Sequence, residues 1–395
     1  MSGWISFFVD LLATLRSLFG KGIAEVIAGV IILLLGFLAK KLWSGGCWLI
    51  DYHHRLRRAL GDVAREEEGG IKREGSSGLW LAKPIGKPQF KSFDPTLPNA
   101  RILVVANAKG GVGKTTVAAN IAACVSEGSE KPVLLVDLDF QASASSMAVA
   151  GDASNWLPPP GHDSAATYLI SGDLTAQQVA GVQMTATTVV LNQNSPRPNL
   201  RLITAGNDLA QAENRVMIEW LLGDRRHDVR FRLKKLLHSD EVRQRYSLIV
   251  LDCPPRLTTA AIQALAAGTH LLVPTILDRP SSEATVNFVR QVEVFRDNKL
   301  TQVRHLGVTA TMTDANANYQ AQVAWLSQRL ADHRNVRGAG GVAKLLDQPT
   351  YITDLAVFRH AAGKGIAYYR MNAGENARER IEKLADIVRR EMAIQ

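Results

Sequence analysis

Short apolar runs alternate with helical stretches along most of the chain, beginning at Arg101. The runs are ILVVAN, VLLVDLD, LRLITA, YSLIVLD, HLLVPTI and HLGVTATM. Near-continuous apolar runs separated by helices are typical of a parallel sheet that is covered on both faces. The pattern therefore predicts an α/β fold for residues 101–395, with a doubly wound and mostly parallel sheet.

A different apolar pattern lies near the start of the chain. Residues 22–39 read GIAEVIAGVIILLLGFLA and carry one charge, Glu25. Extended to Trp43 the segment has 22 residues, which is roughly 33 Å as a helix and enough for a bilayer core. Its uncharged centre, residues 26–39, has a length that also suits a buried helix, so the flanking residues have to separate the two interpretations.

The flanks of this segment favour the membrane. Lys40 and Lys41 can extend to the interface, and Trp43 and Trp48 suit an interfacial belt. Five basic residues follow the segment, and only Arg16 and Lys21 precede it. A secretory signal peptide would need a small-residue cleavage site, which is missing. We therefore expect a transmembrane helix at residues 21–43, a single pass of the inner (cytoplasmic) membrane, and the larger C-terminal part of the chain in the cytoplasm.

The remaining N-terminal residues form two further segments. Residues 1–20 have apolar positions at helical spacing, which indicates an amphipathic helix that lies on the membrane or meets a partner helix. A kinked helix that continues into the span fits the pattern equally well. Residues 44–100 begin with a charged, helical stretch and continue with glycine, serine and proline. The second pattern predicts a juxtamembrane helix followed by a linker.

Composition and charge narrow the picture only slightly. The net charge is +9. Residues 1–100 carry 13 Lys and Arg against 9 Asp and Glu, and the rest carry 33 against 28. A mildly basic, solvated surface explains this balance better than a dedicated DNA-binding stripe. The three cysteines are far apart in sequence, which excludes a local CxxC metal site and fits a reducing compartment.

The first apolar run leads directly into a glycine-rich, phosphate-binding sequence. Residues 109–116 read KGGVGKTT and are followed by the apolar helix VAANIAACV. Glycines let backbone N–H groups converge on a phosphate, and the following helix N-terminus adds positive potential. Lys114 can then reach the β- and γ-phosphates, and Thr115 can ligate Mg²⁺. The expected cofactors are ATP and Mg²⁺.

Three motifs in order resemble the ParA/MinD family of P-loop ATPases with a deviant Walker A sequence. KGGVGKTT resembles the first motif, VLLVDLDFQ the second, and YSLIVLDCPP the Walker B motif. The resemblance covers about residues 101–395. This sequence departs from the family in having Phe140 where proline is usual, Arg256 after the proline pair, and no arginine in TDANAN, which weakens any assignment of adenine contacts.

The resemblance implies a role for each matching residue. Asp139 orients the attacking water, Asp137 supports it, and Asp252 holds Mg²⁺ through water. Lys109 reaches the nucleotide of a partner in a sandwich dimer. The implied catalytic residues are Lys109, Lys114 and Asp139, and the implied metal ligands are Thr115 and Asp252. The candidate nucleotide-binding residues are Lys109, Gly110, Gly111, Val112, Gly113, Lys114, Thr115, Thr116, Asp137 and Asp252.

Three other features have simpler interpretations. The basic run 225–245 has leucines at helical spacing, which predicts an amphipathic helix with a solvated face. An apolar stripe in residues 381–392 predicts a helix packed on the sheet. Cys253 lies beside Asp252 with no base indicated, so we expect a small buried hydrophobic residue rather than a nucleophile.

Together these observations predict a membrane-anchored ATPase that forms an ATP-dependent homodimer and responds to an activating partner protein. Its output would be the positioning or recruitment of a DNA partition complex or of a membrane or envelope assembly, and DNA binding stays open. One alternative is a membrane-linked P-loop tyrosine kinase of the polysaccharide-export type. The tail after Tyr369 contains no tyrosine, which speaks against it. Another is a scaffold that does not hydrolyse ATP, against which the complete set of motif residues speaks.

Overall fold

The computed structural model describes most of the chain after residue 100. The described residues are 13, 14, 17, 40, 43, 46, 47, 50, 54, 78–81, 100–149, 156–159, 161–182, 184–185, 199–222, 228–312, 319–337, 343–347, 350–352, 357–358, 365–372 and 374–394. Contacts divide the chain into two units, Met1–Gly61 and Asp62–Gln395. The second unit contains the whole sheet.

Six parallel strands form the sheet, as the apolar runs predict. They are β1 (Ile102–Val105), β2 (Val133–Asp137), β4 (Leu200–Ile203), β5 (Leu248–Asp252), β6 (His270–Ile276) and β7 (Arg304–Thr311). A two-residue antiparallel strand, β3 (Met184–Thr185), adds to one edge, giving the order β3-β4-β2-β5-β1-β6-β7. The strand β1 is central, with β5 on one side and β6 on the other. The doubly wound, mostly parallel sheet is therefore confirmed.

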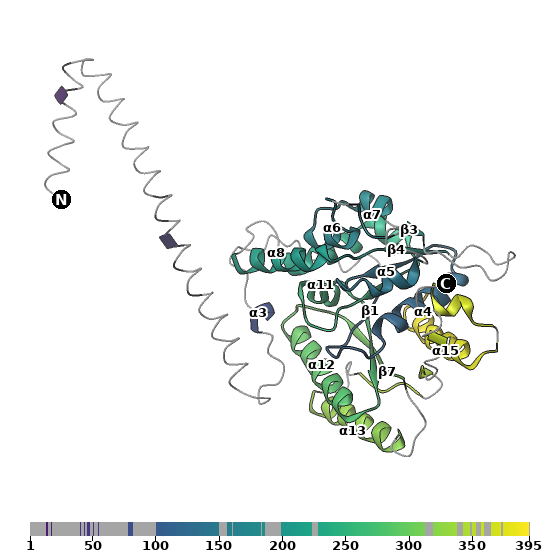
Figure 1. Ribbon diagram of the computed structural model, residues 1–395. Coiled ribbons are helices and arrows are strands. Elements are labelled where there is room, and N and C mark those ends of the chain that lie inside the picture. Colours follow the sequence, from purple (N-terminus) through teal and green to yellow (C-terminus); the bar gives the residue numbers. More distant parts are fainter. Residues whose placement is uncertain are drawn as a thin grey trace. The chain divides into compact units, whose positions relative to one another are not determined.

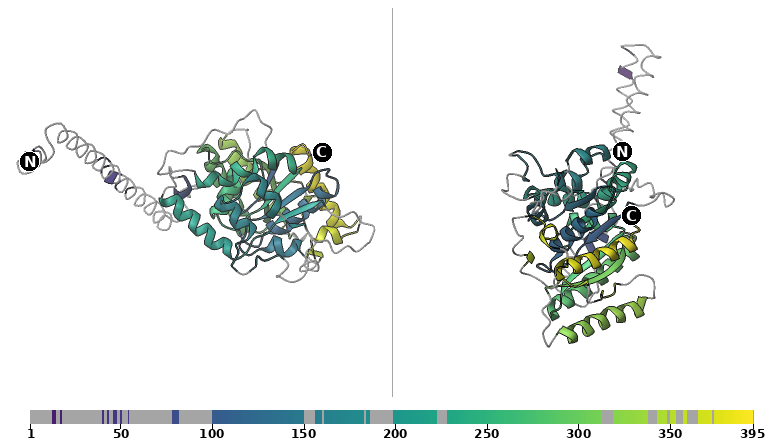
Figure 2. Two further views of the ribbon diagram at one scale, coloured as in Figure 1. Left: turned by 90° about the horizontal axis from the view of Figure 1, so that it is seen from above. Right: turned by 90° about the vertical axis from the view of Figure 1, so that its right-hand side faces the viewer.

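Helices cover both faces of this sheet (Figure 1). Among the described residues of the second unit, the helices and 3₁₀ turns include α3 (Gly78–Leu81), α4 (Lys114–Glu127), α5 (Ser143–Ala148), α6 (Ala165–Ser171), α7 (Ala176–Val182), α8 (Asp208–Leu222), η2 (Val229–Phe231), α9 (Arg232–Leu237), α10 (Asp240–Arg245), α11 (Thr259–Ala267), α12 (Arg279–Asp297), α13 (Tyr319–Arg337), η4 (Ala367–Arg370) and α15 (Asn376–Glu391). Figure 2 shows the same layers from two further directions.

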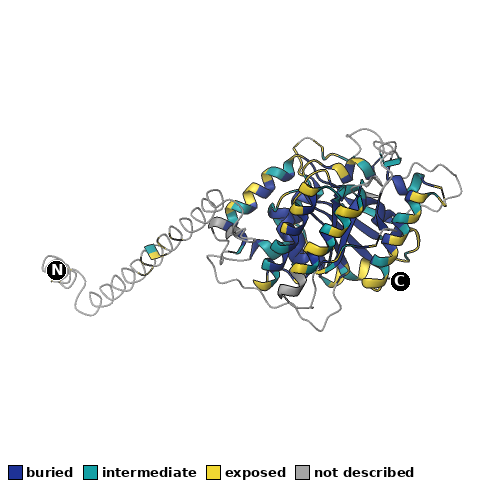
Figure 3. Cartoon of the chain, turned by 90° about the horizontal axis from the view of Figure 1, so that it is seen from below, coloured by how far each residue is buried: buried dark blue, intermediate teal, exposed yellow. Residues whose placement is uncertain are grey.

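Side chains of each strand point alternately to the two faces of the sheet, and an apolar core lies on each face. In β1, Ile102 and Val104 face a core shared with α6, α8, α11 and α12, whereas Leu103 and Val105 face one shared with α4 and α15. Successive strand side chains point to opposite faces, so a strand buried on both sides is apolar throughout. The buried residues accordingly follow the sheet through the second unit (Figure 3).

The two helical expectations have different outcomes. The C-terminal stripe forms α15, in which Ile381, Leu384 and Val388 are buried in the same core as α4, so that interpretation is confirmed. The amphipathic pattern of the run 225–245 is borne out in α9 (Arg232–Leu237), where Leu233, Leu236 and Leu237 are buried, but the run is not one continuous helix. The described part of this run forms η2, α9 and α10, because the chain breaks at His238 and Ser239 and a new helix begins at Asp240.

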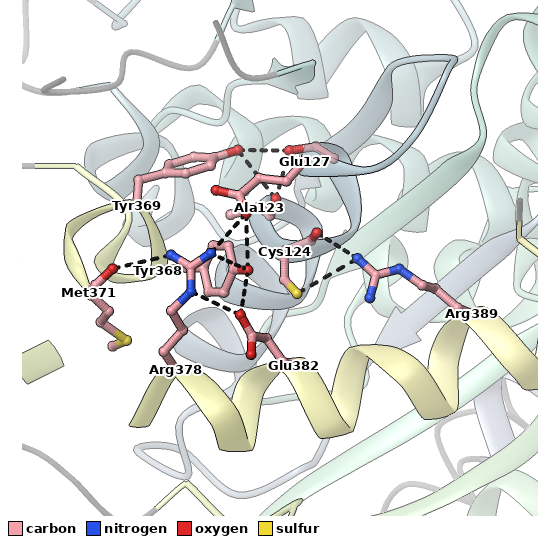
Figure 4. Close-up of polar contacts among 10 residues, drawn as sticks. Ala123, Cys124, Glu127, Tyr368, Tyr369, Met371, Arg378, Glu382 and Arg389 are labelled. Carbon is pink, nitrogen blue, oxygen red and sulfur yellow. Dashed lines mark hydrogen bonds and ion pairs between the residues drawn. The ribbon is translucent and has the colours of Figure 1, made fainter. Parts of the chain in front are cut away.

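The C-terminal helix is fastened to α4 by a polar cluster (Figure 4). The Tyr368 hydroxyl lies 3.1 Å from Glu127 Oε2 and 3.2 Å from Glu382 Oε1, and it accepts a 2.9 Å bond from Arg378. Arg389 donates to the carbonyl oxygen of Cys124 at 2.7 Å. The cluster lies at the end of α4 that is remote from the glycine-rich loop.

The predicted N-terminal segments mostly lie outside the described residues. This holds for residues 1–20, for the expected transmembrane helix at 21–43, and for most of the linker 44–100. No helix among the residues that the structure does describe is long and apolar enough to cross a membrane. Within the linker, α3 is an element that the sequence pattern does not predict.

Candidate functional site

The loop between β1 and α4 has the backbone of a phosphate-binding loop. Gly111 and Gly113 have φ angles of 73° and 77°, which a residue with a side chain rarely adopts. Helix α4 begins at Lys114, and its N-cap, Gly113, makes no side-chain capping bond. The first N–H groups of the helix are therefore not used by a capping side chain, in the arrangement that favours an anion.

The two lysines of the loop have different surroundings. The Lys114 side chain is buried, and its ammonium group donates a 2.9 Å hydrogen bond to the carbonyl oxygen of Lys109. Burial lowers the pKa of Lys114, although the charge of Asp252 acts in the opposite direction. Lys109 is exposed. The loop therefore holds one cation inside the site and presents the other at the surface.

Asp252 ends β5 beside the start of this loop. It is level with Val105 of β1 on one side and with Asp137 of β2 on the other. Its side chain is fully buried, and neither carboxylate oxygen has a hydrogen-bond partner of good geometry in the described part of the chain. Burial raises the pKa of Asp252 well above its usual value and the charge of Asp137 adds to this, while the nearby Thr115 and Lys114 oppose it.

The unsatisfied carboxylate of Asp252 indicates whether a metal ion fits this site. A buried carboxylate without a partner is costly, and a hard cation or its bound water removes that cost. Thr115 lies in the first turn of α4 and supplies a hydroxyl next to this carboxylate. Oxygen donors of this kind suit Mg²⁺, so the residues present fit a nucleotide with a magnesium ion.

Asp137 shapes the turn that presents Asp139. Asp137 Oδ2 accepts bonds from the Ser145 N–H and hydroxyl, both at 2.8 Å, and Oδ1 accepts a bond from the Asp139 N–H at 3.1 Å. Burial raises the pKa of Asp137 to about 6, against the effect of the Ser145 bonds. Asp139 is only partly buried and accepts a 3.0 Å bond from the Gln141 N–H.

A buried polar network that the motifs do not reveal holds the loop in place. The Thr311 hydroxyl lies 2.9 Å from the Val112 carbonyl oxygen and 3.1 Å from the Thr275 carbonyl oxygen. Asn107 donates 2.8 Å bonds to the Pro274 carbonyl oxygen and to Thr285 Oγ1, and it accepts a bond from the Lys109 N–H at 3.1 Å. The phosphate-binding loop is thus anchored to β6, β7 and α12.

The predicted site residues therefore converge at one edge of the sheet, the carboxyl ends of β1, β2 and β5. This is where open α/β sheets bind ligands. Cys253 is buried, with 1% of its surface exposed, which confirms its interpretation as a small hydrophobic residue. Phe140 and Arg256, the two departures from the family pattern, are both exposed. The described residues do not include the TDANAN segment after Met312.

Comparison with known proteins agrees with this geometry. A family model described as an AAA domain matches residues 100–305, just over half of the chain. The sporulation initiation inhibitor protein Soj of Bacillus subtilis is 31% identical over 223 residues, which cover 56% of this chain and 77% of Soj. The chromosome partitioning protein ParA of Caulobacter vibrioides is 30% identical over 224 residues, 57% of this chain and 74% of ParA.

Solved structures show the same fold. The ATP complex of a Cyanothece McdA variant superposes with a TM-score of 0.56 at 16% identity, covering 76% of this chain and 98% of that one. Cobyrinic acid a,c-diamide synthase from Mycobacterium smegmatis, with a bound ATP analogue and magnesium, gives 0.52 at 20% identity, covering 75% and 97%. At these identities the likeness establishes the fold alone.

Proposed function

Because the chain belongs to the ParA/Soj family of P-loop ATPases, we propose that it is a membrane-anchored switch that binds ATP, forms a sandwich dimer and resets by hydrolysing ATP to phosphate. The observation that carries the proposal is a buried Lys114 ammonium group, bonded to the glycine loop and influenced by the charge of the unsatisfied Asp252 carboxylate. Such a site supplies positioning and charge neutralisation, which are the main requirements of phosphoryl transfer.

Each loop residue has a distinct task in the proposed site. The N–H groups of residues 110–116 and the Lys114 ammonium would hold the phosphates, while Thr115 and, through water, Asp252 would hold Mg²⁺. When bound, Mg²⁺ neutralises charge on the phosphate oxygens. Asp139, held in its turn by Asp137, would orient the attacking water. Asp137 itself accepts hydrogen bonds from Ser145 and Asp139, which suits a supporting rather than a reacting role.

The exposure of Lys109 supports the dimer. Lys114, which the proposal assigns to the nucleotide of its own subunit, is buried, whereas Lys109 is exposed at the loop surface. In the proposed dimer Lys109 meets the nucleotide of the partner subunit. ATP binding and dimerisation then become one event.

Membrane anchoring would limit what ATP can control in the proposed switch. A chain that crosses the inner membrane at residues 21–43 stays attached through the whole cycle. ATP must then control dimerisation and partner contacts within the membrane plane, where tethering raises the effective concentration. The partner would be an activating protein of a DNA partition complex or of a membrane or envelope assembly. The name of the similar chromosome partitioning protein ParA favours partition.

The kinase alternative gains no support from Tyr368 and Tyr369. The Tyr368 side chain is 2% exposed, and its hydroxyl contacts two carboxylates and Arg378. The Tyr369 hydroxyl lies 2.8 Å from the Ser126 hydroxyl. Both hydroxyls serve the packing of the C-terminal region against α4.

Two variants of the full chain, purified in detergent, test the switch. Asp139→Ala should retain ATP and accumulate a dimer that does not turn over. Lys109→Ala should bind ATP without forming the productive dimer. Size-exclusion chromatography with light scattering, with Mg-ATP and with Mg-ADP, decides between outcomes. Normal hydrolysis by Asp139→Ala or normal dimerisation by Lys109→Ala would contradict the proposed mechanism.

Extraction experiments test the anchor separately. A helix that spans the bilayer resists both carbonate and high salt, whereas electrostatic attachment is lost when salt screens the basic flank. The full chain should stay in the membrane fraction with or without ATP, and a chain lacking residues 1–45 should leave it. Release of the full chain by salt alone would contradict the anchor while leaving the ATPase proposal intact.

A further inference from the structure

A short piece of the predicted linker is part of the core of the ATPase domain. Trp80, in α3, is 4% exposed, and its ring stacks on that of Trp220 in α8 with centroids 6.3 Å apart and planes inclined by 21°. Figures 1 and 2 both place α3 beside one end of α8. The sequence before residue 100 lies outside the match to the AAA domain, so this contact joins the matched region to a residue that precedes it.

Arg230 closes the contact from the other side. Its guanidinium group lies 4.2 Å from the centre of the Trp220 ring and donates a 2.6 Å hydrogen bond to the Trp80 carbonyl oxygen. It also makes bonds of 2.9 and 2.7 Å to the two carboxylate oxygens of the buried Asp228. We refer to Trp80, Trp220, Asp228 and Arg230 as the Trp80 clasp.

The clasp explains why α3 exists at all. A helix of four residues cannot form by itself, since nucleation is unfavourable and few hydrogen bonds repay it. Two stacked indoles with a guanidinium group over one ring supply buried area and a cation–π contact. The bond from Arg230 to the Trp80 backbone then fixes the helix in one position. Residues 78–81 therefore behave as a docked peptide on the surface formed by α8 and η2.

The helix that receives Trp80 also reaches the nucleotide edge. Glu213 lies seven residues before Trp220, two turns away on the same side of α8. Its carboxylate accepts a 3.0 Å bond from the Ala260 N–H, and its carbonyl oxygen accepts one from the Thr259 hydroxyl at 3.0 Å. Both residues belong to the first turn of α11, which follows the loop after Asp252. The charge of Asp139 also acts on the Glu213 carboxyl, where burial is the main cause of its raised pKa.

We propose that the Trp80 clasp couples the N-terminal segment to the nucleotide site, with residues 78–81 docking more firmly on α8 and η2 when ATP is bound. The inference rests on the proposed ATPase function. ATP binding fixes the loops after β1 and β5, and with them the start of α11. Because Glu213 of α8 is hydrogen-bonded to the start of α11, α8 is then held more firmly as well. By thermodynamic reciprocity, loss of the clasp weakens ATP binding by the factor by which ATP binding strengthens the docking of residues 78–81.

Hydrogen exchange of the full chain in detergent micelles tests the coupling. ATP binding is first measured by calorimetry on the same sample, using a non-hydrolysable ATP analogue with Mg²⁺. Exchange of the backbone amides in a peptide spanning residues 78–81 is then compared with and without the analogue. We expect exchange to slow at least threefold in the bound state. Binding with unchanged or faster exchange overturns the coupling alone, whereas absence of binding overturns the ATPase proposal and the coupling with it.

Variants separate coupling from simple loss of packing. Glu213→Ala should abolish the slowing at residues 78–81 while these residues remain docked. Trp80→Ala should weaken analogue binding about threefold. Arg230→Lys, which is a smaller change in structure, should also weaken it. The control is Trp325→Ala: Trp325 also lies under a guanidinium group, that of Arg279 at 4.1 Å, but belongs to α13, beside α12. If Trp325→Ala weakens binding as much as Trp80→Ala, or if Arg230→Lys binds as the wild type does, the coupling is wrong.

Discussion

The Thr311 hydroxyl lies 2.9 Å from the carbonyl oxygen of Val112, across 199 residues of sequence. This contact fixes the phosphate-binding loop against the end of β7. A Cβ atom added at Gly113 would lie 3.4 Å from Thr311 Cβ, so the loop packs closely on the same side chain. Part of the proposed nucleotide site is therefore built by a strand outside the three nucleotide motifs.

Thr311→Val should weaken ATP binding by replacing the hydroxyl with a methyl group of similar size. The Val112 carbonyl oxygen loses its partner, and a loop held less firmly costs affinity on the order of fivefold, or about 1 kcal/mol. Titration with an ATP analogue measures the loss. Thr309→Val is the matched control, because the buried Thr309 donates to Thr350 instead of to the loop. Equal losses in the two variants would show that Thr311 has no specific effect on the loop.

Lys114→Ala should abolish measurable ATP binding. The buried ammonium group is bonded to the loop and feels the charge of the Asp252 carboxylate, and backbone N–H groups alone neutralise phosphate only in part. Affinity near that of the wild type in a nucleotide titration would contradict the assigned role.

Thr115→Ala should give a milder defect that depends on the magnesium concentration. Only one oxygen donor for the metal ion is removed, and excess Mg²⁺ should compensate for it by mass action. ATP hydrolysis measured over a range of Mg²⁺ concentrations checks this. Thr116→Ala, which changes a candidate nucleotide-binding residue that is not a candidate metal ligand, should give a defect that excess Mg²⁺ does not relieve. A defect that is independent of Mg²⁺ would show that Thr115 acts in another way.

The sequence predicts the sheet well and the supporting contacts poorly, for a physical reason. Six apolar runs become six parallel strands because a strand buried on both faces must be apolar throughout. The two-residue strand β3 is too short to show any period. The Trp80 clasp and the bond from Thr311 to Val112 join residues that are far apart in sequence. One local sign existed, since buried threonines within the apolar run of β7 require hydrogen-bond partners.

His270 should make the ATPase domain less stable in mild acid. Burial, aided by the charge of Arg304, lowers the pKa of this histidine from 6.5 to about 4. Because the unfolded chain binds the proton more readily, the stabilisation is complete above about pH 6.5 and is lost as the pH falls toward 4. At pH 5 the loss is on the order of 1–2 kcal/mol, since partial exposure of the ring reduces the effect.

Urea unfolding of wild type and His270→Gln at pH 7.5 and pH 5 checks this sign. The difference in unfolding free energy between the two pH values should be smaller for the variant. His238, whose pKa burial also lowers, stays in both proteins and does not affect the comparison. An equal pH dependence in the two proteins would exclude His270 as the cause.

Tyr368→Phe should destabilise the fold without changing ATP affinity. The hydroxyl contacts two carboxylates and accepts a bond from Arg378 at 2.9 Å, so its removal should cost about 1–2 kcal/mol. The matched control is Tyr369→Phe, whose hydroxyl meets the neutral Ser126 hydroxyl at 2.8 Å and should cost less than about 1 kcal/mol. Both contacts lie at the Glu127 end of α4, about 20 Å from the glycine loop at its start. Chemical denaturation measures the loss of unfolding free energy in both variants. A greater loss in Tyr369→Phe than in Tyr368→Phe would contradict the assignment of this cluster to stability alone. A change in analogue affinity in Tyr368→Phe would contradict it as well.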